Sequence, residues 1–182
     1  MKRFRGIIRE LLILVLICGT FAANGSDFPK SIQKKIDKEV QKIFPAEDLI
    51  MDDIDNLNLD AFNCEGVRDV NLSTLKKADK LMGFACFASS KGKNDFFDYM
   101  VVFNENLEIQ KVVVLIYRSS YGGEIMAKSW LKQFIGKIGG EEMEFGKDID
   151  GISGATISAP AMAKGVKTLS LLLSELKAKG EI

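Results

Sequence analysis

Apolar residues recur at a helical period near both ends of the chain, and each stripe predicts a helix. The first stripe consists of Ile32, Ile36, Val40 and Ile43, and the second consists of Met162, Val166, Leu169, Leu173 and Leu176. Pro45 ends the first helix, for which Ser31 is a candidate cap. Ser158 followed by Pro160 marks the start of the last helix.

Between these helices, the period changes to that of strands. Three short runs at 81–89, 96–104 and 108–118 are rich in β-branched and aromatic residues and are separated by polar turn segments. They predict three strands of an antiparallel meander. The third run is apolar throughout from Val112 to Tyr117, which predicts a central strand covered on both faces.

A third helix is expected from Glu124 to just before Gly136, with Trp130 as a core residue. The segment 138–149 then predicts a turn and one short strand. No internal repeat or low-complexity linker is present. The order of these elements predicts an α+β fold: a single domain with a twisted antiparallel β-sheet packed with three main helices.

The segment 46–60 is rich in Asp and Asn and has only weak periodicity. Asp52, Asp53 and Asp55 lack the Gly and the terminal Glu of a calcium-binding loop. We therefore expect this segment to be a solvated turn.

The composition excludes several kinds of chemistry. The 182 residues include 25 basic and 25 acidic side chains, so nothing indicates a nucleic-acid surface. The chain has no histidine, which removes imidazole general bases, Ser-His pairs and histidine metal sites. Chemistry at neutral pH must therefore come from other groups or from a cofactor.

The first 23 residues are typical of a secretory signal peptide. Four basic residues precede the apolar run from Leu11 to Ile17, and small residues around Ala22 and Ala23 suit cleavage. An uncleaved membrane anchor is the alternative, while Ile17 disfavours lipid modification of Cys18. Removal of 1–23 leaves 21 basic and 24 acidic side chains, a formal charge of −3.

Two cysteines remain after the leader. Cys64 and Cys86 could pair in an oxidising compartment, but two cysteines do not make a disulfide scaffold. Cys86 would share one face of a strand with Phe84, so we interpret it as a small buried hydrophobic residue.

The stretch 150–158, with the sequence DGISGATIS, places two glycines and three hydroxyl side chains directly before the last helix. The start of a helix has unpaired N–H groups and a positive dipole end, which together can hold a phosphate. On chemistry alone, the stretch is either such a cradle or plain turn-and-cap chemistry. It is neither a P-loop nor a dinucleotide-binding fingerprint.

Asp150, Ser153, Gly154, Ala155 and Thr156 occupy every specified position of the Asp-x-x-(Ser/Thr)-Gly-Ala-Thr motif. The chain thereby resembles the FMN-binding domain family, which includes the covalent-flavin subunits of the sodium-translocating NADH:quinone reductase and of the Rnf electron-transport complex. The order of elements from Leu81 to about Leu176 is also similar. We assign 24–182 to this domain.

The resemblance implies that Thr156 carries FMN through a phosphoester bond. A separate, magnesium-dependent flavin transferase would use FAD as donor and release AMP. Gly154 would keep the approach uncrowded, and Asp150 would assist attachment through metal binding or proton removal.

The loop before the middle helix departs from the family. Where the flavin-bearing proteins of those two complexes carry a Glu-Thr-Pro-Gly-type loop, this chain has 119–124 with the sequence SSYGGE. Tyr121, Gly122 and Gly123 are candidates to contact the flavin, with loop packing as the alternative for Tyr121. Trp130 could also cover the flavin ring, but a core position suits it better.

The resulting functional hypothesis is an exported flavoprotein electron carrier at the outer face of the cytoplasmic membrane or in the periplasm. It would carry covalent FMN on Thr156 and pass electrons between a membrane redox partner and an extracytoplasmic acceptor. Two alternatives stay open: a flavin-dependent reductase with its own small-molecule substrate, and a non-redox binding module with an unmodified Thr156.

Overall fold

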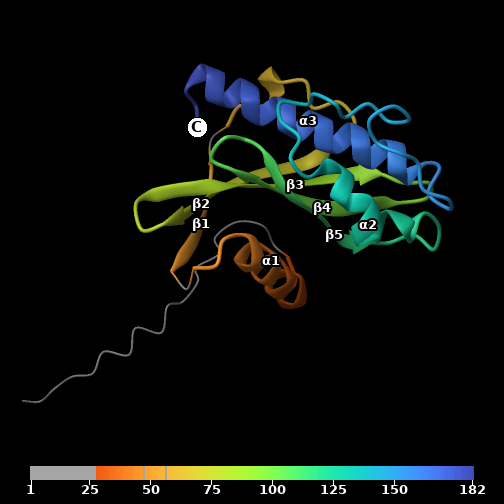
Figure 1. Cartoon of the computed structure of the whole chain (residues 1–182), viewed down its shortest axis with the longest axis horizontal. Helices are drawn as coiled ribbons and strands as arrows, with labels where there is room; N and C mark the ends of the chain where they lie inside the picture. The colour runs from red at the N-terminus through yellow and green to blue at the C-terminus, as the bar shows by residue number, and fades with distance from the viewer. Residues whose placement is uncertain (1–27, 47, 56) are drawn as a thin grey trace, which may run out of the picture.

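A computed structural model describes residues 28–182 except 47 and 56 (Figure 1). The leader predicted at 1–23 lies outside the described residues. The helices are α1 (Lys30–Ile43), α2 (Lys128–Leu131) and α3 (Ser158–Lys179), and the strands are β1 (Leu49–Asp53), β2 (Arg68–Lys77), β3 (Lys80–Lys91), β4 (Phe96–Asn104) and β5 (Ile109–Tyr117). Short 3₁₀ helices are η1 (Leu59–Ala61), η2 (Gly123–Met126) and η3 (Lys132–Phe134).

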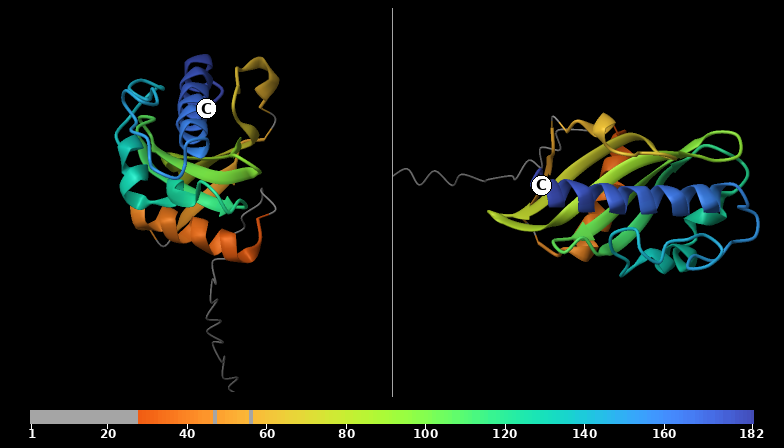
Figure 2. Two further views of the ribbon diagram at one scale, coloured as in Figure 1. Left: turned by 90° about the vertical axis from the view of Figure 1, so that its right-hand side faces the viewer. Right: turned by 90° about the horizontal axis from the view of Figure 1, so that it is seen from above.

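The five strands form one antiparallel sheet in the order β1-β2-β3-β4-β5. Helix α3 and the α2 region cover one face of the sheet, and α1 covers the other (Figures 1 and 2). The predicted α+β domain with a twisted antiparallel sheet and three helices is confirmed. No helix in the described part of the chain combines the length and apolarity that a bilayer crossing requires.

Alternate residues of each strand point to opposite faces, so the sheet supports two separate cores. On the α3 face, 27 buried residues form one cluster, and on the α1 face 11 buried residues form another. Phe84 and Cys86 both belong to the α3-face cluster, as predicted, and burial raises the pKa of the Cys86 thiol. The larger core therefore lies under the helix that follows the motif.

The predicted strands at 81–89, 96–104 and 108–118 are confirmed as β3, β4 and β5, but two further strands precede them. Residues 49–53, which we expected to lie in a turn, form β1. Leu49 and Met51 point into the α1-face core while the acidic residues stay at the surface. In so short a segment, two inward residues are too few to distinguish a strand from a loop by pattern.

The expectation that the third run is a central strand is wrong, because β5 lies at the edge of the sheet. It is nevertheless covered on both faces: Val112 and Val114 enter one core and Val113 the other. A continuous apolar run indicates that both faces of a strand are covered, but it does not indicate which strands are hydrogen-bonded to it. Lys35 of α1 donates to the edge carbonyl oxygen of Val114 at 2.8 Å, which shields part of this open edge.

The helices agree with the sequence in part. Helix α1 ends at Ile43 as expected, but Pro29 precedes its first residue and no side chain caps it, so the Ser31 cap is wrong. The helix expected from Glu124 is broken into η2, α2 and η3. The strand expected within 138–149 is absent from that described segment, which holds only isolated bridges at Ile138, Phe145 and Ile149. Helix α3 starts at Ser158 as predicted.

Candidate functional site

Three segments far apart in sequence meet at one end of the sheet. They are the β3–β4 turn, the loop after β5 and the motif segment before α3. Together they line a shallow depression of about 20 Å³, formed by Lys93, Tyr121, Gly122, Gly154, Ala155, Thr156, Ile157 and Ser158. Of the predicted site residues, the structure brings together Thr156, Gly154, Ala155, Tyr121 and Gly122 at this depression.

The start of α3 has backbone N–H groups without hydrogen-bond partners in the described part of the chain. Among the described residues, the backbone N–H groups of Thr156, Ile157 and Ser158 donate to no other group, and no side chain caps the helix. The Thr156 side chain is exposed. Three consecutive N–H groups at the positive end of a 22-residue helix are donors suited to holding an anion.

Ser158 does not serve as the cap because its hydroxyl is used elsewhere. It is 1% exposed and lies 2.9 Å from the Tyr117 hydroxyl. The Tyr117 hydroxyl itself lies 2.5 Å from the carbonyl oxygen of Tyr121. A tyrosine hydroxyl has one hydrogen, so if it donates to that carbonyl, Ser158 must donate to Tyr117. This pair of bonds joins the loop after β5 to the start of α3.

Two glycines permit the close approach of these segments. Gly154 has φ +89°, and a Cβ there would lie 2.5 Å from the Glu124 carboxyl carbon. Gly122 has φ +84°, and its Cβ would lie 2.6 Å from both the Ser158 and the Tyr117 hydroxyl oxygens. Both backbones occupy the left-handed region that favours glycine. Gly123, by contrast, opens η2 and does not line the depression.

Hydrogen bonds to its main-chain atoms hold Asp150 in place. The Trp130 indole N–H donates to the Asp150 carbonyl oxygen at 2.7 Å, and the Asp150 N–H donates to the Gln133 side chain at 2.8 Å. The residue is exposed and does not line the depression with Thr156. Trp130 itself is 5% exposed and packs edge-on against Phe134. The core interpretation of Trp130 is confirmed.

The rest of the motif forms a tight turn. The Ala155 N–H donates to the Ile152 carbonyl oxygen at 3.2 Å, and the Ala155 carbonyl oxygen accepts from the Ala159 N–H at 2.9 Å. Ala155 is buried, whereas Ser153 is exposed and does not line the depression. The turn therefore presents Thr156 outward while anchoring Ala155 inward.

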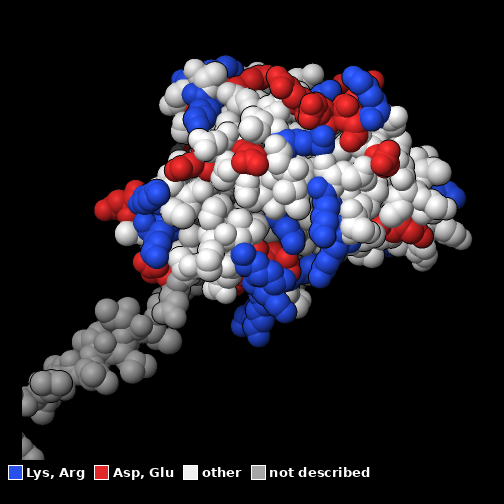
Figure 3. All heavy atoms as spheres, viewed as in Figure 1, with Lys and Arg blue, Asp and Glu red and all other residues white. Residues whose placement is uncertain are grey.

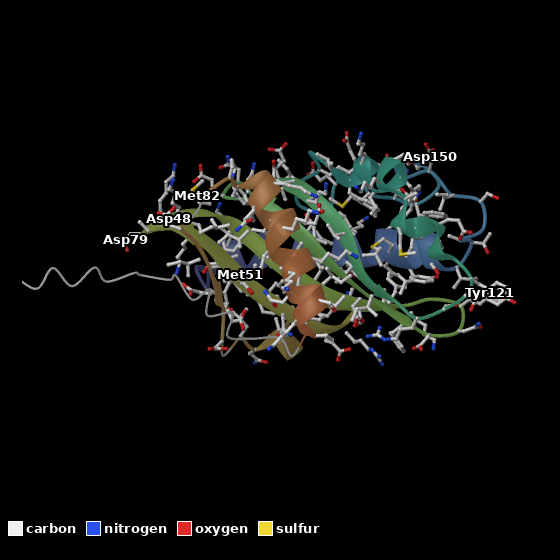
Figure 4. The ribbon with its side chains drawn as sticks, turned by 90° about the horizontal axis from the view of Figure 1, so that it is seen from below. Asp48, Met51, Asp79, Met82, Tyr121 and Asp150 are labelled. Carbon is white, nitrogen blue, oxygen red and sulfur yellow. The ribbon has the colours of Figure 1, made fainter. Side chains whose placement is uncertain are left out.

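Tyr121 is 60% exposed, and the Lys93 ammonium lies 4.8 Å from the centre of its ring. Figure 4 shows Tyr121 at the tip of its loop, at the end of the molecule. Sequence analysis missed Lys93, Tyr117 and the role of Ser158. The sequence indicated only that 90–95 is a turn. It could not indicate that Lys93 lies near Thr156, because that proximity depends on the β3–β4 register.

An ion pair anchors the loop after β5. Arg118 donates to Asp98 through two bonds of 2.9 and 2.5 Å. Burial by itself raises the pKa of Asp98, but the bonds from Arg118 and from Ser89 outweigh it and lower that pKa below its ordinary value.

Two roomier hollows lie away from the motif. One of about 420 Å³ on the α1 face is bordered by Phe28, Arg68, Asp98 and Arg118. Another of about 390 Å³ lies between α3 and residues 62–65. Neither contains a residue of 150–158, so we place the candidate site at the smaller depression, where the anion-binding donors are.

Residues 92–170 match the sequence profile of the FMN-binding domain family. Over these residues the chain is similar to that family. The match runs from the β3–β4 turn through the motif into the middle of α3, and so includes each residue that lines the depression. The match supports a flavin-binding protein with FMN as its cofactor. A search of curated proteins found no match.

Proposed function

We propose that this protein is an electron carrier that holds FMN covalently on Thr156 through a phosphoester bond. The observation that carries the proposal is the exposed Thr156 side chain at a helix start where the N–H groups of residues 156–158 have no partner among the described residues. A Ser158 hydroxyl that capped the helix would accept a hydrogen bond from a backbone N–H of the first helical turn. Here the Ser158 hydroxyl is bound to Tyr117 instead.

The residues of the depression fit a phosphodiester. The N–H groups of 156–158 would hold its negative charge, with Lys93 as a nearby cation. In the attachment, a bond from Thr156 Oγ1 to phosphorus replaces the bond between that phosphorus and AMP, and the hydroxyl proton is lost. Gly154 leaves the backbone beside Thr156 uncrowded.

The bound cofactor supplies one-electron or two-electron transfer. A depression of about 20 Å³ has room for roughly one water-sized group. It therefore suits phosphate oxygens and not a three-ring flavin, which would stay accessible at this end of the molecule, near Tyr121. A flavin ring that stays accessible at this end of the molecule favours a carrier that meets its partners directly.

The proposal includes maturation by a separate flavin transferase that needs Mg²⁺ and FAD, and export beyond the cytoplasmic membrane, where a tethered cofactor cannot be lost. The partners would be a membrane redox complex and an extracytoplasmic acceptor. Asp150 supports the transferase step, because its main chain is fixed by Trp130 and Gln133 while its side chain remains exposed.

The test is the intact mass of the protein produced with an active flavin transferase. We expect a gain equal to FMN less water for the natural chain and for Thr156→Ser, which keeps the hydroxyl, and no gain for Thr156→Ala. Asp150→Asn should slow the gain in mass without altering the melting temperature. An unmodified natural chain, or a modified Thr156→Ala protein, would refute the attachment.

A further inference from the structure

The outer surface of α1 is strongly basic. The helix carries five lysines, namely Lys30, Lys34, Lys35, Lys38 and Lys42. At the helical period these lie on the arc opposite the buried Ile36 and Val40. Asp37 and Glu39 fall on the two borders of this arc, so the arc itself contains no carboxylate.

The two acidic residues each have a hydrogen-bond or ion-pair partner. Asp37 accepts a hydrogen bond from Gln33 at 3.0 Å. Burial raises the pKa of Glu39, but its contacts with Lys42 and Lys111 outweigh this and lower that pKa. Both carboxylates therefore have partners other than Lys30, Lys34 and Lys38.

Three lysines are left with free charge. Lys35 donates to the carbonyl oxygen of Val114 and Lys42 pairs with Glu39. Lys30, Lys34 and Lys38 are exposed, and none of them forms an ion pair with any described residue. They are spaced one turn apart, so three unneutralised ammonium groups follow one line along the helix. We call this line the lysine row.

We propose that the lysine row binds the anionic headgroups of a phospholipid membrane and lays the α1 face of the domain on that surface. Three properties favour a membrane over other polyanions. The chain as a whole has equal numbers of basic and acidic residues, so it lacks the broad basic field of a nucleic-acid binder. The exposed arc also has no aromatic or Arg side chain to stack on bases or to anchor a protein interface.

The third property is position. The lysine row starts at Lys30, and residues 18–29 separate it from the apolar run Leu11–Ile17, so the row lies on the first helix that the structure describes after that run. Figure 3 shows basic side chains projecting from the underside of the molecule, where Figure 1 places α1. Seen from that side in Figure 4, α1 crosses the middle of the face and Tyr121 lies at one end. With the α1 face on the membrane, the candidate flavin site faces sideways, toward a neighbour in the same membrane.

No large apolar side chain is exposed on the arc, so the binding is electrostatic and does not include insertion. Each lysine near an anionic surface is expected to strengthen binding by on the order of fivefold. Loss of all three should therefore weaken binding by on the order of a hundredfold, and added salt should also weaken it.

The experiment uses the chain from Asn24 onward, which contains every residue of both cores. Its partition onto vesicles of phosphatidylcholine, with or without phosphatidylglycerol, is measured by flotation. We expect binding only with phosphatidylglycerol and its loss in Lys30→Gln/Lys34→Gln/Lys38→Gln. The control Lys80→Gln/Lys128→Gln/Lys132→Gln changes the net charge equally at three other exposed lysines that lack an ion pair within the described residues.

Equal binding to both kinds of vesicle, no binding to either, or equal loss in the control would overturn the proposal. Circular dichroism shows whether each variant keeps its fold. The experiment needs no flavin, so its outcome is independent of the attachment at Thr156.

Discussion

The two faces of the sheet are covered in different ways. Helix α3 buries 12 of its 22 residues, whereas the 14-residue α1 buries only Ile36 and Val40. Small residues let α3 approach the sheet closely: a Cβ on Gly165 would lie 2.0 Å from the Tyr99 hydroxyl. Close packing of α3 on its face of the sheet fixes the position of the start of α3. The looser packing of α1 on the other face leaves most of its charged surface exposed.

The largest expected effect tests the close approach of α3. Gly165→Ala should destabilise the fold by about 3 kcal/mol, because the added methyl group overlaps the buried Tyr99 hydroxyl. Chemical denaturation measures the change. Tyr99→Phe removes the overlapping oxygen, so the double variant should recover part of the loss. No recovery would mean that the contact with Tyr99 does not set the packing distance.

A smaller effect is expected at the bonds between Tyr117, Tyr121 and Ser158. Tyr117→Phe should cost about 2 kcal/mol, because the buried Ser158 hydroxyl loses its partner. It should also slow flavin attachment, because the loop after β5 is then no longer tied to the start of α3. Thermal unfolding and the mass assay measure the two effects. An unchanged attachment rate would show that this tie does not position Thr156.

The glycine of the motif allows a matched comparison. Gly154→Ala and Gly146→Ala both place a side chain at positive φ, +89° and +84°, and each should cost about 1 kcal/mol in stability. Only the Gly154 methyl group meets another group, the Glu124 carboxylate, since nothing lies within 4 Å of the Gly146 position. Attachment should therefore slow in Gly154→Ala alone. Equal slowing in both would point to backbone strain as the cause.

The smallest effect is expected on the α1 face. Asp98→Asn removes the pair with Arg118 and should cost less than about 1 kcal/mol at neutral pH, because Arg118 is partly exposed. The pKa of Asp98 is lower in the folded than in the unfolded protein, so this stability exists above the ordinary aspartate pKa and is lost as pH falls through the folded value. Urea unfolding of both proteins should converge in acid. A constant difference would contradict the ion pair.

Much of the fold was accessible from local patterns. The apolar stripes of α1 and α3 and the runs of β3, β4 and β5 each belong to an element of nine residues or more, which is long enough for the pattern to be recognised. Strand β1 could not be recognised, because only Leu49 and Met51 reach the core from it. The edge position of β5 was also hidden, since burial of a strand's faces does not specify its hydrogen-bonded neighbours.

The sequence by itself determined the α+β class, the resemblance to the FMN-binding domain family and the position of Thr156 at a helix start, because periodicity and a contiguous motif are local properties. Only the tertiary structure decided what surrounds Thr156. Lys93 and Tyr121 reach it from two other loops, and the Tyr117 hydroxyl, 41 residues away along the chain, holds Ser158 so that it cannot cap α3. These contacts depend on strand register and on the distance between α3 and the sheet, which many residues set together and no short stretch encodes.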